Sequence, residues 1–211
     1  MKTLTERERI LRTYRRQEVD RIPMLDSAWA GTVRRWQNEG MPKDVSWVDY
    51  FGFDHQIRVG TDNSPRFAQK VLEENDRYKI VTTQWGTTQK RFRELDSTPE
   101  NLNYYYDCSE RWEEAKQAML TYHEDRIPWD YLKNNYPRWK AEGRFLQLTV
   151  WFGFDVAHSH MIGTENFLVG LLDEPEWATD VFDTYLKTSL DLCQRILDAG
   201  YEFDGVHWYD D

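Results

Sequence analysis

The chain has little cysteine. Cys108 and Cys193 are the only two among 211 residues, and they form no Cys-x-x-Cys or Cys/His pattern. Zinc modules and disulfide frameworks need such spacings, so the sequence predicts neither within these residues. Two free thiols are typical of a reducing compartment, and we expect a cytoplasmic protein.

Long apolar runs and basic stripes are also missing. The mean hydropathy is −0.82, and no apolar run approaches the roughly 18 residues that a membrane helix needs. The first 17 residues are charged from the start and lack the apolar segment of a secretory signal. The net charge is −10, with acidic and basic residues interspersed. We therefore expect neither nucleic acid nor a membrane as partner.

The most regular part of the sequence is its last stretch, residues 173–211. Pro175 suits a first helical turn, apolar residues recur every three or four positions after it, and Gly200 suits the residue after a helix. FDGVHWY then reads as a strand that ends on Asp210 and Asp211. Ligands bind at the carboxyl ends of parallel strands, so we interpret both acids as catalytic candidates.

Helices and strands alternate along the rest of the chain. We predict helices at residues 6–17, 28–40, 110–123, 155–172 and 175–199, with a further helical start near Ser97. Predicted strands are 21–25, 55–60, 143–153 and 203–209, and 78–92 reads as a β-hairpin around Gly86. This order predicts a single α/β domain with about four parallel strands and an inserted hairpin.

Four segments carry a resemblance to a known family. They are LTERERILRTYRRQEVDRIPM, WQNEG with the later DYFGFD, MIGTENFLVGLLDEPEWATDVFDTYL, and DAGYEFDGVHWYDD. Together, in this order, they resemble the uroporphyrinogen decarboxylase superfamily. The resemblance implies a (β/α)8 TIM barrel of which residues 1–211 are the N-terminal half, truncated on the C-terminal side, because a full barrel needs about 250 residues.

Two enzyme activities are open within this family. A decarboxylase would bind a tetrapyrrole with many carboxylates, which requires several arginines. The family has two arginines around the Ala-Gly pair of AWAGTV, where this chain has Ala28 and Thr32. Ser159 stands where a tyrosine is expected and Asp210 where a serine is expected. These departures favour the corrinoid-linked methyltransferase branch over a uroporphyrinogen decarboxylase.

The methyltransferase interpretation implies two cofactors. Those enzymes bind zinc through a His-x-Cys pair and a later cysteine, and they transfer a methyl group between a corrinoid protein and a small-molecule substrate. The resemblance places the zinc ligands beyond residue 211, and Cys193 falls on the apolar face of a predicted helix. No cofactor site is evident within these residues.

The resemblance and the residue types together nominate the remaining site residues. Asp62 matches the catalytic aspartate expected after the second barrel strand. His158, Ser159, His160 and His207 are substrate-binding candidates. His158 and His160 are two apart, so a helix would not let them chelate one metal well, and metal-binding, pocket-lining and structural roles stay open.

Asp54 and Asp155, in the paired FGFD segments, are interpreted as turn and cap residues.

A non-catalytic binding or assembly module is the alternative from another class. A half barrel would have open strand edges, so we expect pairing with a second copy or with a complementary half-barrel.

Overall fold

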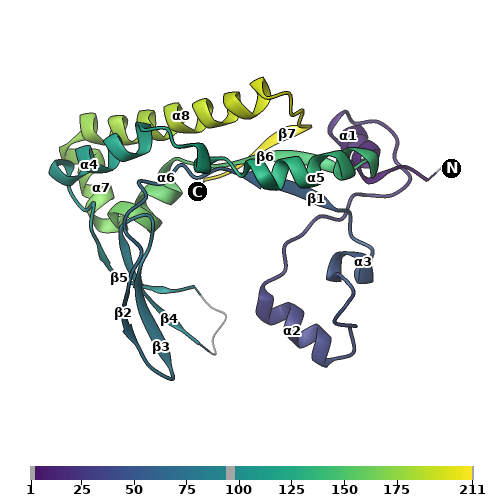
Figure 1. Cartoon of the computed structure of the whole chain (residues 1–211), viewed down its shortest axis with the longest axis horizontal. Helices are drawn as coiled ribbons and strands as arrows, with labels where there is room; N and C mark the ends of the chain where they lie inside the picture. The colour runs from purple at the N-terminus through teal and green to yellow at the C-terminus, as the bar shows by residue number, and fades with distance from the viewer. Residues whose placement is uncertain (1–2, 94–97, 211) are drawn as a thin grey trace. The chain divides into compact units, whose positions relative to one another are not determined.

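The fold is a mixed α/β arrangement with two β-sheets (Figure 1). It is a computed structural model that describes residues 3–93 and 98–210. The helices are α1 (Glu6–Tyr14), α2 (Ala30–Asn38), α3 (Trp47–Phe51), α4 (Ser109–Leu120), α5 (Trp129–Ala141), α6 (Phe154–Val156), α7 (Thr164–Asp173) and α8 (Pro175–Asp198), with a 3₁₀ turn at Glu124–Arg126 and a π-helix at Ala157–Ile162. The strands are β1 (Gln56–Gly60), β2 (Val71–Glu74), β3 (Tyr78–Thr82), β4 (Thr87–Phe92), β5 (Glu100–Tyr104), β6 (Phe145–Trp151) and β7 (Gly205–Tyr209).

Two compact units make up the chain. The first unit contains residues 1–59, 129–148 and 202–206, and the second contains residues 60–128, 149–201 and 207–211. Each unit is thus assembled from three segments that lie far apart in the sequence. Among the described residues, no helix is both long and apolar enough to cross a bilayer.

The smaller sheet is parallel and has the strand order β1-β6-β7. Its strands match three of the four predicted strands, those at residues 55–60, 143–153 and 203–209. β6 is the middle strand, and Phe145, Leu146, Leu148 and Val150 along it are all buried. A nearly continuous apolar run is typical of a parallel strand that is covered on both faces.

The fourth predicted strand, residues 21–25, is wrong. The backbone groups of Met24 bind Asp54 instead of a neighbouring strand. Its N–H donates to Asp54 Oδ2 at 2.9 Å, and its carbonyl accepts the Asp54 N–H at 2.9 Å. The Arg21 guanidinium binds the same carboxylate at 2.7 and 2.9 Å. One carboxylate thus holds the segment, and residues 21–25 have no strand ladder.

Charge pairing organises the first unit. The Asp54 side chain is fully buried and is bound by both Arg9 and Arg21. Arg9 also donates to both oxygens of Asp20, at 2.7 and 2.9 Å. A buried carboxylate is tolerated only when it is paired, so Asp54 is a structural anchor and not only the predicted turn residue.

The predicted start of α1 is confirmed. Glu8 N–H donates to Thr5 Oγ1 at 3.2 Å, and Thr5 N–H donates to Glu8 Oε2 at 3.0 Å. These two bonds form a complete capping box, which satisfies two helix-end donors at once.

The larger sheet lies in the second unit and is antiparallel, with the order β2-β3-β4-β5 (Figure 1). The predicted hairpin is confirmed as β3 and β4, with Tyr78 opposite Phe92 and Gly86 in the turn at φ +84°. A Cβ at Gly86 would lie 2.8 Å from the Tyr106 ring, so the turn needs glycine.

β5 corrects the helix that was predicted to start near Ser97. Ser97 itself lies outside the described residues, but Glu100–Tyr104 is a strand. It pairs with β4, with Thr87 opposite Tyr104. Cross-strand pairing with the hairpin overrides the weak helix signal of Pro99 and Glu100, which came from local sequence alone.

The predicted helix at residues 155–172 is divided into three pieces. α6 has only three residues, the π-helix follows it directly, and Gly163 at φ +96° separates the π-helix from α7. A Cβ at Gly163 would lie 2.9 Å from the Tyr104 ring. The break therefore occurs where β5 approaches the helix backbone.

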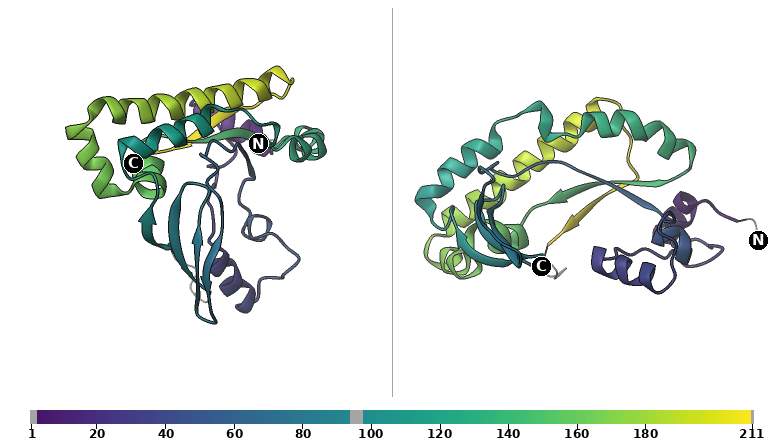
Figure 2. Two further views of the ribbon diagram at one scale, coloured as in Figure 1. Left: turned by 60° about the vertical axis from the view of Figure 1, so that its left-hand side comes forward. Right: turned by 60° about the horizontal axis from the view of Figure 1, so that its bottom comes forward.

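α8 confirms the helix predicted at residues 175–199. Pro175 occupies its first turn and Gly200 follows its end at φ +87°. Its buried face packs against α4 (Figure 2). Trp112 of α4 donates to Asp180 Oδ2 at 2.7 Å, and Lys116 pairs with Asp180 Oδ1 at 2.9 Å. Part of the predicted apolar face is exposed, namely Leu186, Leu190 and Leu197.

One buried guanidinium holds the loops of the second unit. Arg126 is 1% exposed and donates to four backbone carbonyls, those of Asp62, Ser64, Ala118 and Thr121, at 2.5–3.1 Å. Burial lowers the pKa of Arg126, and its nearest described carboxylate is Asp62 at 3.9 Å. Backbone dipoles therefore replace most of the solvation that this charge lost.

Replacing Arg126 with alanine should destabilise the protein strongly. Four carbonyls, all at least partly buried, would lose their donor, and we expect the free energy of unfolding to fall by about 3 kcal/mol. Urea denaturation measures this change. The control is Arg35→Ala, which removes an exposed pair with Glu39 at 2.7 Å and should change stability little. Equal effects of the two substitutions would contradict the role of Arg126.

Candidate functional site

The end of β6 meets the residue after β7 at Gly153 and Asp210. Asp210 Oδ1 accepts the backbone N–H of Asp155 at 2.8 Å, so it caps the first turn of α6. Gly153 has φ +100°, and a Cβ there would overlap the Asp210 carboxylate. The predicted catalytic residue Asp210 therefore positions the segment that follows β6. Asp211, the second predicted acid, lies outside the described residues.

Asp155 is an acid that sequence reasoning assigned only to a turn or cap. It is 8% exposed. Trp151 Nε1–H donates to its Oδ2 at 3.0 Å, and Ser159 Oγ lies 3.3 Å from its Oδ1. Ser159 Oγ–H also donates to the Asp155 carbonyl at 2.6 Å. These contacts fix the carboxylate at the carboxyl end of β6.

His158 stands beside this carboxylate. Its Nε2 is 3.8 Å from Asp155 Oδ1, and its Nδ1 is 3.0 Å from Thr164 Oγ1. The ring stacks on Phe154 with centroids 4.5 Å apart. The side chain is 19% exposed, so a small molecule can reach it. A histidine that is held by a hydroxyl on one ring nitrogen and lies near a carboxylate on the other is suited to proton transfer.

His160 has a different environment. Its ring contacts Trp151 edge-on at 4.3 Å, and its carbonyl accepts a hydrogen bond from Thr87 Oγ1. Burial lowers the pKa of His160, although the nearby Asp155 charge opposes that shift. The two histidines contact different aromatic rings, in keeping with the expectation that they would not face one another.

Asp62 forms a second cluster, after β1. Its carboxylate accepts from Ser64 Oγ at 2.6 Å and from Arg66 Nε at 2.7 Å. Arg66 also pairs with Asp125 at 2.9 Å, which lowers the pKa of that carboxyl. Arg66 has φ +56°, a left-handed conformation that costs about 1 kcal/mol in a residue with a side chain. Asp62 is thus fully bonded within the protein.

Asn63 links the segment after β1 to β6 and α8. It is 4% exposed, and its Nδ2 donates to the Trp151 carbonyl at 2.8 Å and to Ser189 Oγ at 3.1 Å. Asn63 was not predicted as a site residue, because a lone asparagine after a strand gives little signal. His207, a predicted substrate-binding residue, is half-buried within β7.

The structure therefore brings together most of the predicted residues at one place. Asp155, His158, Ser159, His160 and Asp210 form the cluster that we call the β6-end site. Asp155 is the member of this site that was not predicted. The sequence did contain a signal for it, because Asp155 and His158 are three residues apart and share a helix face.

The β6-end site does not form a metal centre from the described residues. No group of three or more His, Cys, Asp or Glu side chains that could hold a metal occurs within residues 3–93 and 98–210. Cys108 and Cys193 are both free, and burial raises the pKa of each thiol.

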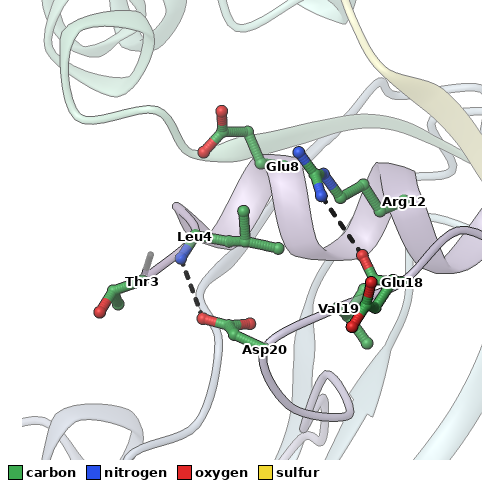
Figure 3. Close-up of a pocket in the computed structure, with 7 residues that line it drawn as sticks. All are labelled: Thr3, Leu4, Glu8, Arg12, Glu18, Val19 and Asp20. Atoms are coloured by element: carbon green, nitrogen blue, oxygen red, sulfur yellow. Dashed lines mark hydrogen bonds between the residues drawn. The ribbon is translucent and has the colours of Figure 1, made fainter. Parts of the chain in front are cut away.

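A separate hollow lies in the first unit beside α1 (Figure 3). Seven residues line it: Thr3, Leu4, Glu8, Arg12, Glu18, Val19 and Asp20. Leu4 N–H donates to Asp20 Oδ2 at 2.9 Å, and Arg12 Nη1 donates to the Glu18 carbonyl at 3.3 Å. A hydrogen bond from Arg9 lowers the pKa of Asp20. These bonds hold the loop against α1, and none of the predicted site residues lies here.

Comparisons of the chain with models of known families, with curated proteins and with solved structures find no match. The family resemblance therefore stays a prediction.

Alanine at Gly153 should disturb the β6-end site more than the backbone conformation alone explains. Gly200 is the matched control, because it also has a positive φ but has nothing within 4 Å of an added Cβ. We expect Gly153→Ala to lower the free energy of unfolding by about 1–3 kcal/mol more than Gly200→Ala. Urea denaturation of both variants measures the difference. Equal losses would contradict the close contact with Asp210.

His160 should make stability depend on pH. Its pKa in the folded protein is lowered, so the unfolded chain takes up a proton first as the pH falls. Stability should therefore be full above about pH 7 and should decline as the pH falls through about 6.5. Denaturation midpoints of His160→Gln should change less between about pH 7 and 5.5. The exposed His123→Gln is the control, and a wild-type slope in His160→Gln would refute the assignment.

Proposed function

We propose that this chain is part of an enzyme of the uroporphyrinogen decarboxylase superfamily, nearer to the corrinoid-linked methyltransferases than to the decarboxylases. Its reaction would transfer a methyl group to a small acceptor. The barrel that the resemblance implies, and a cytoplasmic location, belong to the same proposal.

The parallel sheet supports the barrel part of the proposal. β1, β6 and β7 are neighbours in the order in which they occur along the chain. Consecutive strands of a (β/α)8 barrel have this order, and the active site of such a barrel lies at the carboxyl ends of the strands. The antiparallel sheet falls between β1 and β6 in sequence, as an insertion would.

The Asp155–His158 pair is the observation that carries the proposed chemistry. A methylated cobamide would supply the methyl group, and the acceptor must lose its proton as its bond to that group forms. His158 is oriented by Thr164, partly exposed, and 3.8 Å from a buried carboxylate. Because Nδ1 is bonded to Thr164, Nε2 of His158 would take the acceptor proton as the general base, and the nearby Asp155 carboxylate would stabilise the resulting imidazolium.

The arginines near the predicted catalytic Asp62 favour methyl transfer over decarboxylation. A substrate with many carboxylates needs several guanidiniums that can bind it bidentately. Arg66 is already paired with Asp62 and Asp125, and Arg126 is buried among backbone carbonyls. Neither offers two donors to a bound carboxylate.

The described residues do not fit a zinc site. Cys193 lies on α8 and Cys108 precedes α4, and no cluster of three potential ligands includes either. No step of the proposed reaction is therefore assigned to zinc. The part played by this chain is to orient a base and to hold its carboxylate partner.

The test is an assay of methyl transfer from methylcobalamin to a panel of thiols. The visible absorbance of the cobamide, which changes as the methyl group leaves, monitors the reaction. The protein should be expressed from the complete reading frame that contains this sequence. We expect turnover, and we expect His158→Gln to lower kcat about 100-fold or more because the base is lost. His123→Gln, an exposed histidine outside the site, is the control and should keep wild-type turnover.

Release of carbon dioxide from uroporphyrinogen, without methyl transfer, would overturn the proposal in favour of the decarboxylase. Absence of both activities in a folded protein would favour the binding or assembly module.

A further inference from the structure

Two cations stand directly opposite one another in the antiparallel sheet. Lys79 of β3 is the cross-strand partner of Arg91 of β4. Paired residues of antiparallel strands point to the same face, with Cβ atoms about 5 Å apart, and like charges in such a pair are destabilising. In a chain with a net charge of −10, this pairing calls for an explanation.

The acids within the described residues do not neutralise the pair. Among the described residues, neither Lys79 nor Arg91 has a carboxylate within ion-pair distance. The residue opposite Lys79 on β2 is Glu74, but its carboxylate is bound by Arg93. Counted over the described residues, the face that carries Lys79, Arg91 and, just after β4, Arg93 is thus left with an excess of positive charge.

Arg91 is held in place by a neutral group. Its Nη2 and Nε donate to Gln89 Oε1 at 2.8 and 3.2 Å. Gln89 is 5% exposed, and its own Nε2 donates to Asn101 Oδ1 at 3.0 Å. An amide tether fixes the guanidinium without cancelling its charge, so donors of the exposed Arg91 side chain stay available to a ligand.

The same row of side chains leads to the β6-end site. Asn101 Nδ2 donates to the Ser159 carbonyl at 2.9 Å, and Thr87 Oγ1 donates to the carbonyl of His160. Both carbonyls belong to the π-helix that also carries His158. Hydrogen bonds through Gln89 and Asn101 therefore connect Arg91 to the backbone of the π-helix, within one unit. Lys79 stands beside Arg91 on the neighbouring strand.

We propose that Lys79 and Arg91 bind an anionic group of the substrate, a carboxylate or a phosphate, whose reacting atom lies at His158. This assignment to the substrate rests on the proposed function. One guanidinium and one ammonium suit a single anionic group, since arginine grips two oxygens and lysine adds a point charge. A bound anion would also relieve the repulsion between the two cations.

The experiment is calorimetric titration of the full chain with inorganic phosphate and, separately, with succinate, at low salt. We expect at least one probe to bind, and Arg91→Gln and Lys79→Gln each to weaken that binding about tenfold. The matched control is Lys90→Gln. Lys90 lies next to Arg91 on the opposite face, over the rings of Tyr78 and Phe92 at 4.5 and 5.1 Å. The Lys90→Gln substitution removes the same charge, and we expect it to change the Kd of the anion by less than about twofold.

Each outcome decides the proposal. Binding of phosphate alone or of succinate alone identifies the anionic group. No binding of either probe, or equal weakening by Lys90→Gln, would overturn the site in favour of diffuse charge. Anion binding does not require turnover, so an intact anion site without methyl transfer would refute only the proposed function.

A stability measurement checks that the variants fold. Arg91→Gln should change the thermal midpoint little, because removal of the like-charge pair offsets the loss of the two hydrogen bonds to Gln89. Lys90→Gln should lower it slightly, because it loses two cation–π contacts.

Discussion

The second unit depends on a buried guanidinium whose described hydrogen bonds all go to backbone carbonyls. Arg126 joins the end of α4, the following 3₁₀ turn and the segment after β1 through backbone carbonyls alone. That segment contains Asn63, which in turn binds the Trp151 carbonyl and Ser189. Trp151 orients Asp155, and Asp155 stands beside His158. A few polar contacts thus connect the Arg126 guanidinium to the β6-end site.

Sequence periodicity predicted the elements whose signals are local. The capping box of α1, the hairpin of β3 and β4, the apolar run of β6 and the proline-to-glycine span of α8 all occur as expected. The elements that were predicted wrongly are those that depend on long-range contacts. The extended segment at residues 21–25 binds the buried Asp54, and β5 forms because β4 is available as a partner. Neither contact can be predicted from the residues next to the element that it determines.

The candidate site was predicted in part, for a related reason. His158, Ser159, His160 and Asp210 were nominated from residue type and from the resemblance, and they do lie together around the start of α6. Asp155 was assigned to a turn, because a carboxylate at a strand–helix junction is usually a cap. Its burial and its contact with Trp151 distinguish it, and both depend on the tertiary structure. Likewise, the pairing of Lys79 with Arg91 depends on the register between β3 and β4. The geometry of the turn at Gly86 sets that register, and the sequence alone does not give it.

Because of the π-helix at Ala157–Ile162, the geometry of the β6-end site depends on the number of residues in this segment as well as on their types. A π-helical turn accommodates an extra residue relative to an α-helical one. A related chain with one residue fewer between Gly153 and Gly163 could form an ordinary α-helix there. Each side chain after the deletion would then turn by about 100° about the helix axis. Such a chain could keep an aspartate, a serine and both histidines and still separate the base from its carboxylate. Among relatives of this protein, the spacing between these two glycines is therefore a better marker of the site than the presence of its polar residues.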